Sequence, residues 1–232
     1  MPSKRYKKAL ELVDGKKVYP LKSAVEVVSK FPKAKFNETV EVAFRLGVDP
    51  KQSDQMVRGS VPLPHGSGKT VRVLVFARDG NAAEAAKAAG AEFVGFEDMI
   101  KKCQEGWTEF DVAVATPEAM VEVRKLGKVL GPRGLMPNPK TGTVTDDTAK
   151  AVKEVKAGRI EFKVDKAGNV HVPVGKASFA LDQIVDNARA VIEAVIKARP
   201  ASVKGQFVQS CTLSATMSPP VRVDIREFLA AT

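Results

Sequence analysis

The sequence predicts two fold classes in one chain of 232 residues: a discontinuous α+β domain, split and β-α-β-like, and an inserted three-layer α/β domain that is Rossmann-like. Residues 67–158 alternate strand and helix patterns, which is typical of a parallel sheet with helices on both faces. Residues 1–66 and residues 159–232 each hold too few strands for a stable sheet, so we expect them to form one domain together. The chain would then cross between the domains at 62–68 and near Gly158.

In the first segment, one helix and one strand have clear patterns. Apolar residues at helical spacing predict a helix that Ser23 and Glu26 would begin as a capping box and that Pro32 would end. Residues 39–46 alternate in polarity, which predicts a strand with one buried face and one wet face. The residues on its apolar face are Val40, Val42, Phe44 and Leu46.

The middle segment opens with a continuous apolar run over 71–77, as expected for a strand buried on both faces. The elements that we expect after it are a helix over 82–89, a strand at 93–94, a helix around 99–103, a strand over 111–115, a helix from Pro117 and a helix start at Thr145. Asp146 and Asp147 fit that helix start better than a metal site.

The last segment returns to the α+β pattern. Strands at 160–164 and 169–173 are expected to form a hairpin that turns at 166–169. An unbroken apolar stripe over 181–199 predicts a long helix, with Pro200 beyond its end. A final strand over 206–217 has a largely apolar odd-numbered face and carries hydroxyls at even positions, namely Ser210, Thr212, Ser214 and Thr216.

Charge gives the first indication of a partner. The chain carries a net charge of +10 and has a pI near 9.6, which favours a polyanionic partner such as a nucleic acid. Lys and Arg outnumber Asp and Glu by 13 to 7 in residues 1–66, by 10 to 7 in 159–232 and by 14 to 13 between them. The basic excess therefore lies mainly in the two ends, which we expect to combine.

Other classes of protein fit the sequence less well. No apolar run has the roughly 18–20 residues of a membrane helix, and the first residues do not have the pattern of a secretory signal. Cys103 and Cys211 are far apart and lack metal-ligand spacing, which favours a cytoplasmic protein without disulfide bonds, metal or cofactor. Because the chain has only His65 and His171 and no nucleophile motif, we expect that it is not an enzyme.

A nucleotide-binding enzyme built on the inserted domain is the alternative. The segment 65–70 (His-Gly-Ser-Gly-Lys-Thr) resembles part of a phosphate-binding loop, but Leu63 stands where that motif needs glycine, and a strand rather than a helix is expected to follow. The first strand-to-helix turn of the domain holds one glycine, Gly80, beside Asp79, which would repel a pyrophosphate. A hinge role for 62–68 is therefore favoured.

Two segments have the chemistry of RNA binding. The hydroxyl row of the last strand, with the segment 35–39 (Lys-Phe-Asn-Glu-Thr), would give a sheet face with hydroxyls, a cation and an aromatic ring, which suits phosphates, 2′-hydroxyls and bases. A solvated strand face explains the same pattern equally well. Between 123 and 145 there are five basic residues and no acid, around a stretch rich in Gly and Pro. An irregular loop is the simpler interpretation of that stretch.

Residues 130–144, with the sequence Leu-Gly-Pro-Arg-Gly-Leu-Met-Pro-Asn-Pro-Lys-Thr-Gly-Thr-Val, closely resemble the signature of the ribosomal protein L-one family. Further stretches resemble this family in order along essentially the whole chain, at 34–41, 53–55, 57–59, 63–66, 156–162, 173–176 and 216–217. The chain resembles a bacterial member of the family.

The resemblance implies two domains joined by a hinge, in a structural constituent of the large subunit of the cytoplasmic ribosome. Such a protein binds 23S rRNA at the mobile stalk, assists release of deacylated tRNA from the exit site and represses translation of its own operon mRNA. It would be a monomer when free and would bind no membrane.

The resemblance also assigns site residues by motif. The RNA contacts that it implies are Lys35, Phe36, Thr39, Glu41, His171, Lys176, Ser210, Thr216, Met217 and Ser218. At Ser218 the family usually has glycine, and a Cβ there would hinder a close approach of the backbone to RNA. The hinge residues that we expect are Pro64, Gly66, Gly68 and Gly158.

Overall fold

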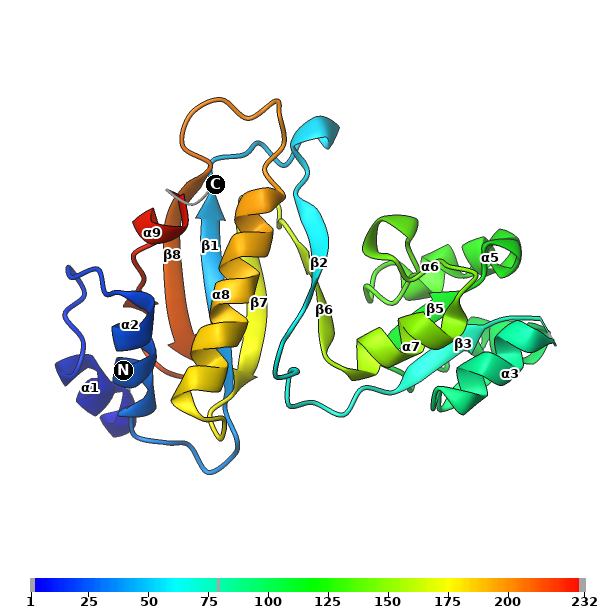
Figure 1. Cartoon of the computed structure of the whole chain (residues 1–232), viewed down its shortest axis with the longest axis horizontal. Coiled ribbons are helices and arrows are strands. Elements are labelled where there is room, and N and C mark those ends of the chain that lie inside the picture. Colours follow the sequence, from blue (N-terminus) through cyan, green and yellow to red (C-terminus); the bar gives the residue numbers. More distant parts are fainter. Residues whose placement is uncertain (1–2, 79, 230–232) are drawn as a thin grey trace. The chain divides into compact units, whose positions relative to one another are not determined.

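The computed structural model describes residues 3–78 and 80–229 and divides the chain into two compact units (Figure 1). Unit 1 comprises Met1–Gly68 and Ile160–Thr232, and unit 2 comprises Lys69–Arg159. The sequence predicted domain boundaries after residues 66 and 158. It stays a prediction that the two units are independent domains. Asp79, the acidic residue of the first strand-to-helix turn, lies outside the described residues.

The main sheet of unit 1 joins the two ends of the chain. Its strand order is β7-β1-β8-β9, with β1 at Thr39–Leu46, β7 at Asn169–Lys176, β8 at Val208–Ala215 and β9 at Val221–Arg222. Strand β1 is antiparallel to both of its neighbours, so a strand from the first segment lies between two strands from the last. Neither segment alone forms this sheet, in agreement with the expectation that each segment holds too few strands for a stable sheet.

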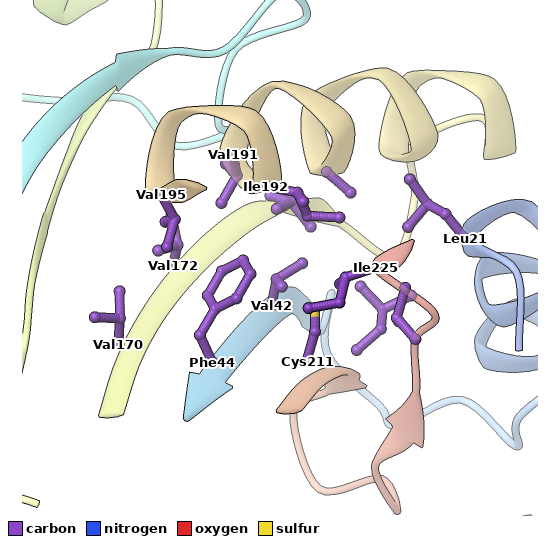
Figure 2. Packing of buried hydrophobic residues seen from close by; sticks show 14 of the residues in the cluster. Leu21, Val42, Phe44, Val170, Val172, Val191, Ile192, Val195, Cys211 and Ile225 are labelled. Atoms are coloured by element: carbon purple, nitrogen blue, oxygen red, sulfur yellow. The ribbon is translucent and has the colours of Figure 1, made fainter. Parts of the chain in front are cut away.

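One face of this sheet is covered by α2 (Leu21–Ser29) and α8 (Leu181–Lys197). Figure 2 shows Val42 and Phe44 of β1 pointing toward Val191, Ile192 and Val195 of α8. The predicted apolar face of β1 is confirmed, since its four residues are all buried. The side chains of the opposite face are half-buried or exposed along β1, and this leaves a wet sheet face.

Five elements in the described part of unit 1 were not foreseen, and strand β9 is one of them. Helix α1 (Lys4–Glu11) and helix α9 (Arg226–Leu229) lie near the two ends of the chain, and the short 3₁₀ turn η1 (Ser53–Gln55) precedes β2 (Arg58–Pro62). Helix α1 begins at Ser3, whose side chain accepts a hydrogen bond from the N–H of Tyr6. Only Ala9 of this helix is buried, so its apolar signal in the sequence is weak.

The predicted hairpin is wrong, although its turn exists. Asp165 accepts hydrogen bonds from the N–H groups of Ala167 and Asn169, which closes the turn. However, β6 (Arg159–Lys163) pairs with β2 in a separate two-stranded sheet, while β7 pairs with β1. Strand β7 is the end strand of the main sheet with β1 as its neighbour, and β6 pairs with β2 of the first segment instead.

The predicted capping box is also wrong. Helix α2 begins at Leu21, two residues before Ser23, and its N-cap residue Pro20 has no side-chain hydrogen bond. Leu21 is buried in the core, so burial of an apolar residue in the first turn fixes the start of this helix.

Unit 2 has a three-stranded parallel sheet in the order β4-β3-β5, with β3 at Val73–Phe76, β4 at Phe93–Gly95 and β5 at Val112–Ala115. Val73 and Val75 pack with α3 (Asn81–Ala88) and α7 (Thr148–Lys156). Leu74 and Phe76 pack on the other side with α4 (Glu97–Gln104), α5 (Pro117–Val123) and α6 (Gly127–Leu130). The three-layer α/β class is therefore confirmed, together with the burial of β3 on both faces.

Two details of unit 2 correct the sequence analysis. Helix α7 starts at Thr148, and its N-cap residue is Asp147, which accepts from the N–H of Lys150; the predicted start at Thr145 was early. The stretch expected to be an irregular loop is helical over Arg124–Leu130, as the 3₁₀ turn η2 (Arg124–Leu126) followed by α6. Leu126 and Leu130 are fully buried there, and this burial gives the stretch its helical face.

Candidate nucleic-acid interface

The wet face of the unit 1 sheet carries rows of polar side chains that cross β7, β1 and β8. Residues directly opposite each other in antiparallel strands share a face. The register therefore gives two rows, Asn169–Arg45–Ser210 and His171–Ala43–Thr212, and Arg222 of β9 lies beside Thr212. Glu41 lies in the third row, opposite Pro173 and Ser214. Arg45 and Arg222 place two guanidinium cations on this face, beside the Glu41 carboxylate.

At one end of the sheet, Thr39 and Thr216 hold each other through backbone and hydroxyl groups. The N–H of Thr39 donates to Thr216 Oγ1 at 3.1 Å, and the N–H of Thr216 donates to the Thr39 carbonyl at 3.0 Å. Lys176 Nζ donates to Thr39 Oγ1 at 2.8 Å. Thr39 thus contacts the Thr216 hydroxyl through its backbone and the Lys176 ammonium group through its own hydroxyl. We call this end of the sheet, with the segment 35–39 and the turn 215–218, the β1–β8 end.

Two large apolar side chains are exposed in the segments that meet at the β1–β8 end. Phe36 is 56% exposed and Met217 is 70% exposed. Phe36 lies three residues before Thr39, and Met217 follows Thr216, so the pairing of the two threonines brings both segments to the same end. Exposed aromatic and apolar groups beside cations and hydroxyls suit stacking with bases and contacts with sugars.

The segment that carries Phe36 is fixed to the body of unit 1 by Glu38. This residue is only 5% exposed, and its Oε1 accepts from Arg5 Nη1 of α1 at 2.9 Å. The carbonyl of Glu38 accepts from the N–H of Ala177 at 2.8 Å, and Asn37 Nδ2 donates to Ser178 Oγ at 3.0 Å. Arg5 was missed in the sequence analysis, because it lies 33 residues before Glu38 and no periodic pattern connects the two.

The structure places the predicted RNA contacts in two groups. Seven of them lie at the β1–β8 end: Lys35, Phe36, Thr39, Lys176, Thr216, Met217 and Ser218. Glu41 and His171 lie further along the wet face, and Ser210 is six residues from Thr216 along the same strand direction, or about 20 Å. The set is thus an extended strip rather than one compact cluster. Arg222 lies on this strip and was not singled out, because its strand has only two residues.

The first crossing segment is attached to unit 1 as far as Gly68. Asn187 of α8 is fully buried, accepts from the N–H of His65 at 3.0 Å, and donates to the carbonyls of Gly66 at 3.0 Å and Val174 at 2.7 Å. Gly68 has a positive φ of 68°, and a Cβ there would meet Lys176 Cγ and the Phe179 ring at 2.9 Å. Among the other expected hinge residues, Gly66 and Gly158 also have positive φ, of 69° and 105°, and Pro64 is exposed.

The segment 65–70 lacks the setting of a phosphate-binding loop. The chain runs from Thr70 into β3 rather than into a helix. Lys69 Nζ, the cation of the motif, donates to Asp111 Oδ1 at 2.6 Å. This hydrogen bond, helped by two from Arg72, lowers the pKa of Asp111 to about 2. The lysine is therefore engaged within unit 2.

A hollow at the carboxyl ends of β3 and β5 is the place where a sheet of this kind binds nucleotides. Among the described residues, the charged groups that line it are Arg78 and three acids, Glu118, Asp146 and Asp147. An excess of carboxylates disfavours a pyrophosphate. Among the described residues, no group of three or more His, Cys, Asp and Glu side chains has the geometry of a metal site. No described helix is long and apolar enough to cross a membrane.

Most of the chain matches the sequence model of a known protein family. A sequence model of the family described as the ribosomal protein L1p/L10e family matches residues 28–219. The match includes β1, β7 and β8, with the β1–β8 end, and the whole of unit 2. Helix α1, which supplies Arg5, precedes it.

Proposed function

Because this chain belongs to the ribosomal protein L1p/L10e family, we propose that unit 1 binds the large-subunit rRNA of the mobile stalk through the β1–β8 end. Membership of the family makes the chain a ribosomal protein that associates with rRNA on the cytoplasmic ribosome, and the family is not a family of enzymes. The RNA element and the residues that contact it are the proposed part.

The observation that carries the proposal is the contact of Thr39 with Thr216 and Lys176, in segments that also carry two exposed apolar side chains. Structured RNA that is not a regular helix is recognised through 2′-hydroxyls, phosphates and unstacked bases. In our proposal Lys35 and Lys176 contact phosphates, the two threonine hydroxyls contact sugars or phosphates, and Phe36 and Met217 pack against bases. The fixed hydrogen bonds among the polar groups reduce the ordering that RNA binding requires.

The residues on the wet face extend this interface. Glu41 would repel a phosphate, so we assign it to hydrogen bonds with a 2′-hydroxyl or a base amino group. His171 and Ser210 have exposed side chains on β7 and β8 and would contact the RNA further along the strip. Arg45 and Arg222, which the sequence analysis did not select, would add phosphate contacts on the same face.

Two further roles belong to the same proposal. Unit 2 would move as a rigid body about the two crossings and assist release of deacylated tRNA from the exit site. Unit 1 would bind the mRNA of the operon that encodes the protein, with the same surface that binds the stalk rRNA, and would repress translation of that mRNA. A compact unit 2 and glycines of positive φ at both crossings support the first role.

The test is a filter-binding titration of the whole chain with a stalk rRNA fragment at several salt concentrations, beside an unrelated folded RNA of equal length. We expect a clear preference for the stalk fragment and a salt slope that counts the phosphate contacts. Equal affinity for both RNAs would show a merely basic protein. Equilibrium dialysis with ATP tests the alternative enzyme, and micromolar binding lost on Lys69→Ala would favour that alternative.

A further inference from the structure

The turn that follows β8 presents Thr216 and Met217 to solvent, and it is closed by Ser218. The N–H of Ser218 donates to the carbonyl of Ala215 at 3.0 Å, which makes 215–218 a β-turn. Met217, its third residue, has a φ of 69° and is the one non-glycine residue with a positive φ in the described part of the chain. This is the geometry of a type II turn, whose third position favours glycine or asparagine. The backbone at Met217 therefore needs support from its surroundings.

The Ser218 side chain supplies this support. Its Oγ accepts from the N–H of Ala215 at 2.9 Å and donates to the carbonyl of Pro219 at 3.2 Å. Strand β9 pairs with β8 only at Thr212 and Leu213, so at Ala215 the hydroxyl takes the place of a neighbouring strand. The hydroxyl has a single proton, and the structure uses it within the protein.

The exposure of the turn residues distinguishes those that can contact RNA from those that hold the turn in place. Thr216 and Met217 are exposed, whereas Ser218 is half-buried and Ala215 is buried. Thr216 is also fixed to β1 through Thr39, while Met217 makes no such contact and depends on the turn for its direction. A side chain that keeps a binding group in place before the ligand arrives lowers the conformational entropy lost on binding.

We propose that Ser218 is a positioning residue of the RNA site: its hydroxyl holds the 215–218 turn closed, so that Thr216 and Met217 face the RNA in one conformation. The inference rests on the proposed function of the β1–β8 end. It replaces the expectation that Ser218 contacts the RNA and that its Cβ hinders approach, because the side chain points back to the protein backbone.

The test uses the whole chain with Ser218→Ala, Ser218→Thr and the wild type, each checked for an unchanged melting temperature. Hydrogen exchange of the Ala215 amide is measured in the free protein, and the dissociation constant is measured for the stalk rRNA fragment. We expect Ser218→Ala to speed exchange at Ala215 and to weaken RNA binding by about 3- to 10-fold, the range for loss of one neutral hydrogen bond. Ser218→Thr keeps the Oγ and should restore both values.

The two readouts distinguish positioning from contact. Weaker RNA binding by Ser218→Ala with unchanged exchange at Ala215 would make the hydroxyl an RNA contact and overturn the inference. Unchanged binding with faster exchange would also overturn it, because the turn would then matter only to the free protein. If the wild type shows no preference for the stalk fragment, the proposed function is wrong. The inference then fails with it, even if the exchange result shows that Ser218 closes the turn.

Discussion

The N–H of Thr39 donates a hydrogen bond of 3.1 Å to Thr216 Oγ1, although 177 residues separate the two in the sequence. The threonines lie at the same end of adjacent antiparallel strands. An exposed apolar side chain lies near each of them in the sequence, Phe36 before Thr39 and Met217 after Thr216. The contact joins the first and last segments of the chain at the surface that we propose to bind RNA. Substitutions at this place therefore test the fold and the function separately.

Thr216→Ala and Phe36→Ala should each weaken specific RNA binding. The first removes a hydroxyl that organises the β1–β8 end, and the second removes an aromatic face. We expect losses of about 1–3 kcal/mol in the free energy of binding for each. Filter binding with the stalk rRNA fragment measures this, with Thr216→Ser and Val121→Ala as controls that keep the hydroxyl or truncate an exposed apolar residue of unit 2. Unchanged affinity in both alanine variants would refute the site assignment.

Arg5→Ala should destabilise unit 1 by leaving the carboxylate of Glu38 without its cation. Glu38 is 5% exposed, while the Arg5 side chain is 27% exposed, so solvent screens part of the effect. We expect the free energy of unfolding in urea to fall by about 1–3 kcal/mol. Glu38→Gln combined with Arg5→Ala should cost less than the sum of the two single changes. Strict additivity would show that the ion pair contributes nothing.

The sequence predicts those elements that depend on nearby residues better than those that depend on contacts between distant segments. The alternation in β1 and the apolar stripe of α8 predict their elements, because each buries one face against the core. The pairing of β6 with β2 is not predictable from the residues of β6, since the turn at Asp165 is compatible with a hairpin and the true partner strand lies in the distant first segment of the chain. In the site, Phe36 and Thr216 lie in recognisable motifs, whereas Arg5 and Arg222 reach it through long-range packing and register.

Asn187→Leu should lower stability more than an exposed amide substitution does. Asn187 is fully buried, and its amide satisfies the N–H of His65 and the carbonyls of Gly66 and Val174. Leucine has a similar volume but leaves these backbone groups without that partner, so we expect a loss of about 2–4 kcal/mol in urea unfolding. Gln104→Leu, at an exposed position of α4, is the control, with an expected change within about 0.5 kcal/mol. Equal effects at the two positions would contradict the role of Asn187.

Asp111 should make the stability of unit 2 depend on acid pH. Its pKa is lowered from 3.8 to about 2, chiefly by the hydrogen bond from Lys69. A lowered folded-state pKa adds stability above the unfolded pKa, and this stability is lost as pH falls from about 4 through 2. Because Lys69 is 59% exposed, we expect a contribution of only about 1 kcal/mol.

The measurement is urea unfolding of the wild type and Asp111→Asn at pH 6 and pH 2 (about two pH units on either side of the unfolded pKa). The stability difference between the two proteins should shrink at the lower pH. Asp98→Asn, at the exposed surface of α4, controls for the general effect of removing a carboxylate. A difference that stays the same at both pH values would contradict the assigned role of Asp111.

A chain that lacks residues 69–159, with Gly68 joined to Ile160 by a short Gly-Ser linker, should still fold and bind the stalk rRNA fragment. The cut retains Gly66, whose carbonyl accepts a hydrogen bond from Asn187, and Gly68, where an added Cβ would meet Lys176 and Phe179 of unit 1. The main sheet and its core lie entirely in the retained residues. We expect a dissociation constant within about threefold of the whole chain, or ~0.6 kcal/mol. A shortened chain whose β1 amides are protected from exchange, yet which does not bind, would show that unit 2 carries an essential part of the interface.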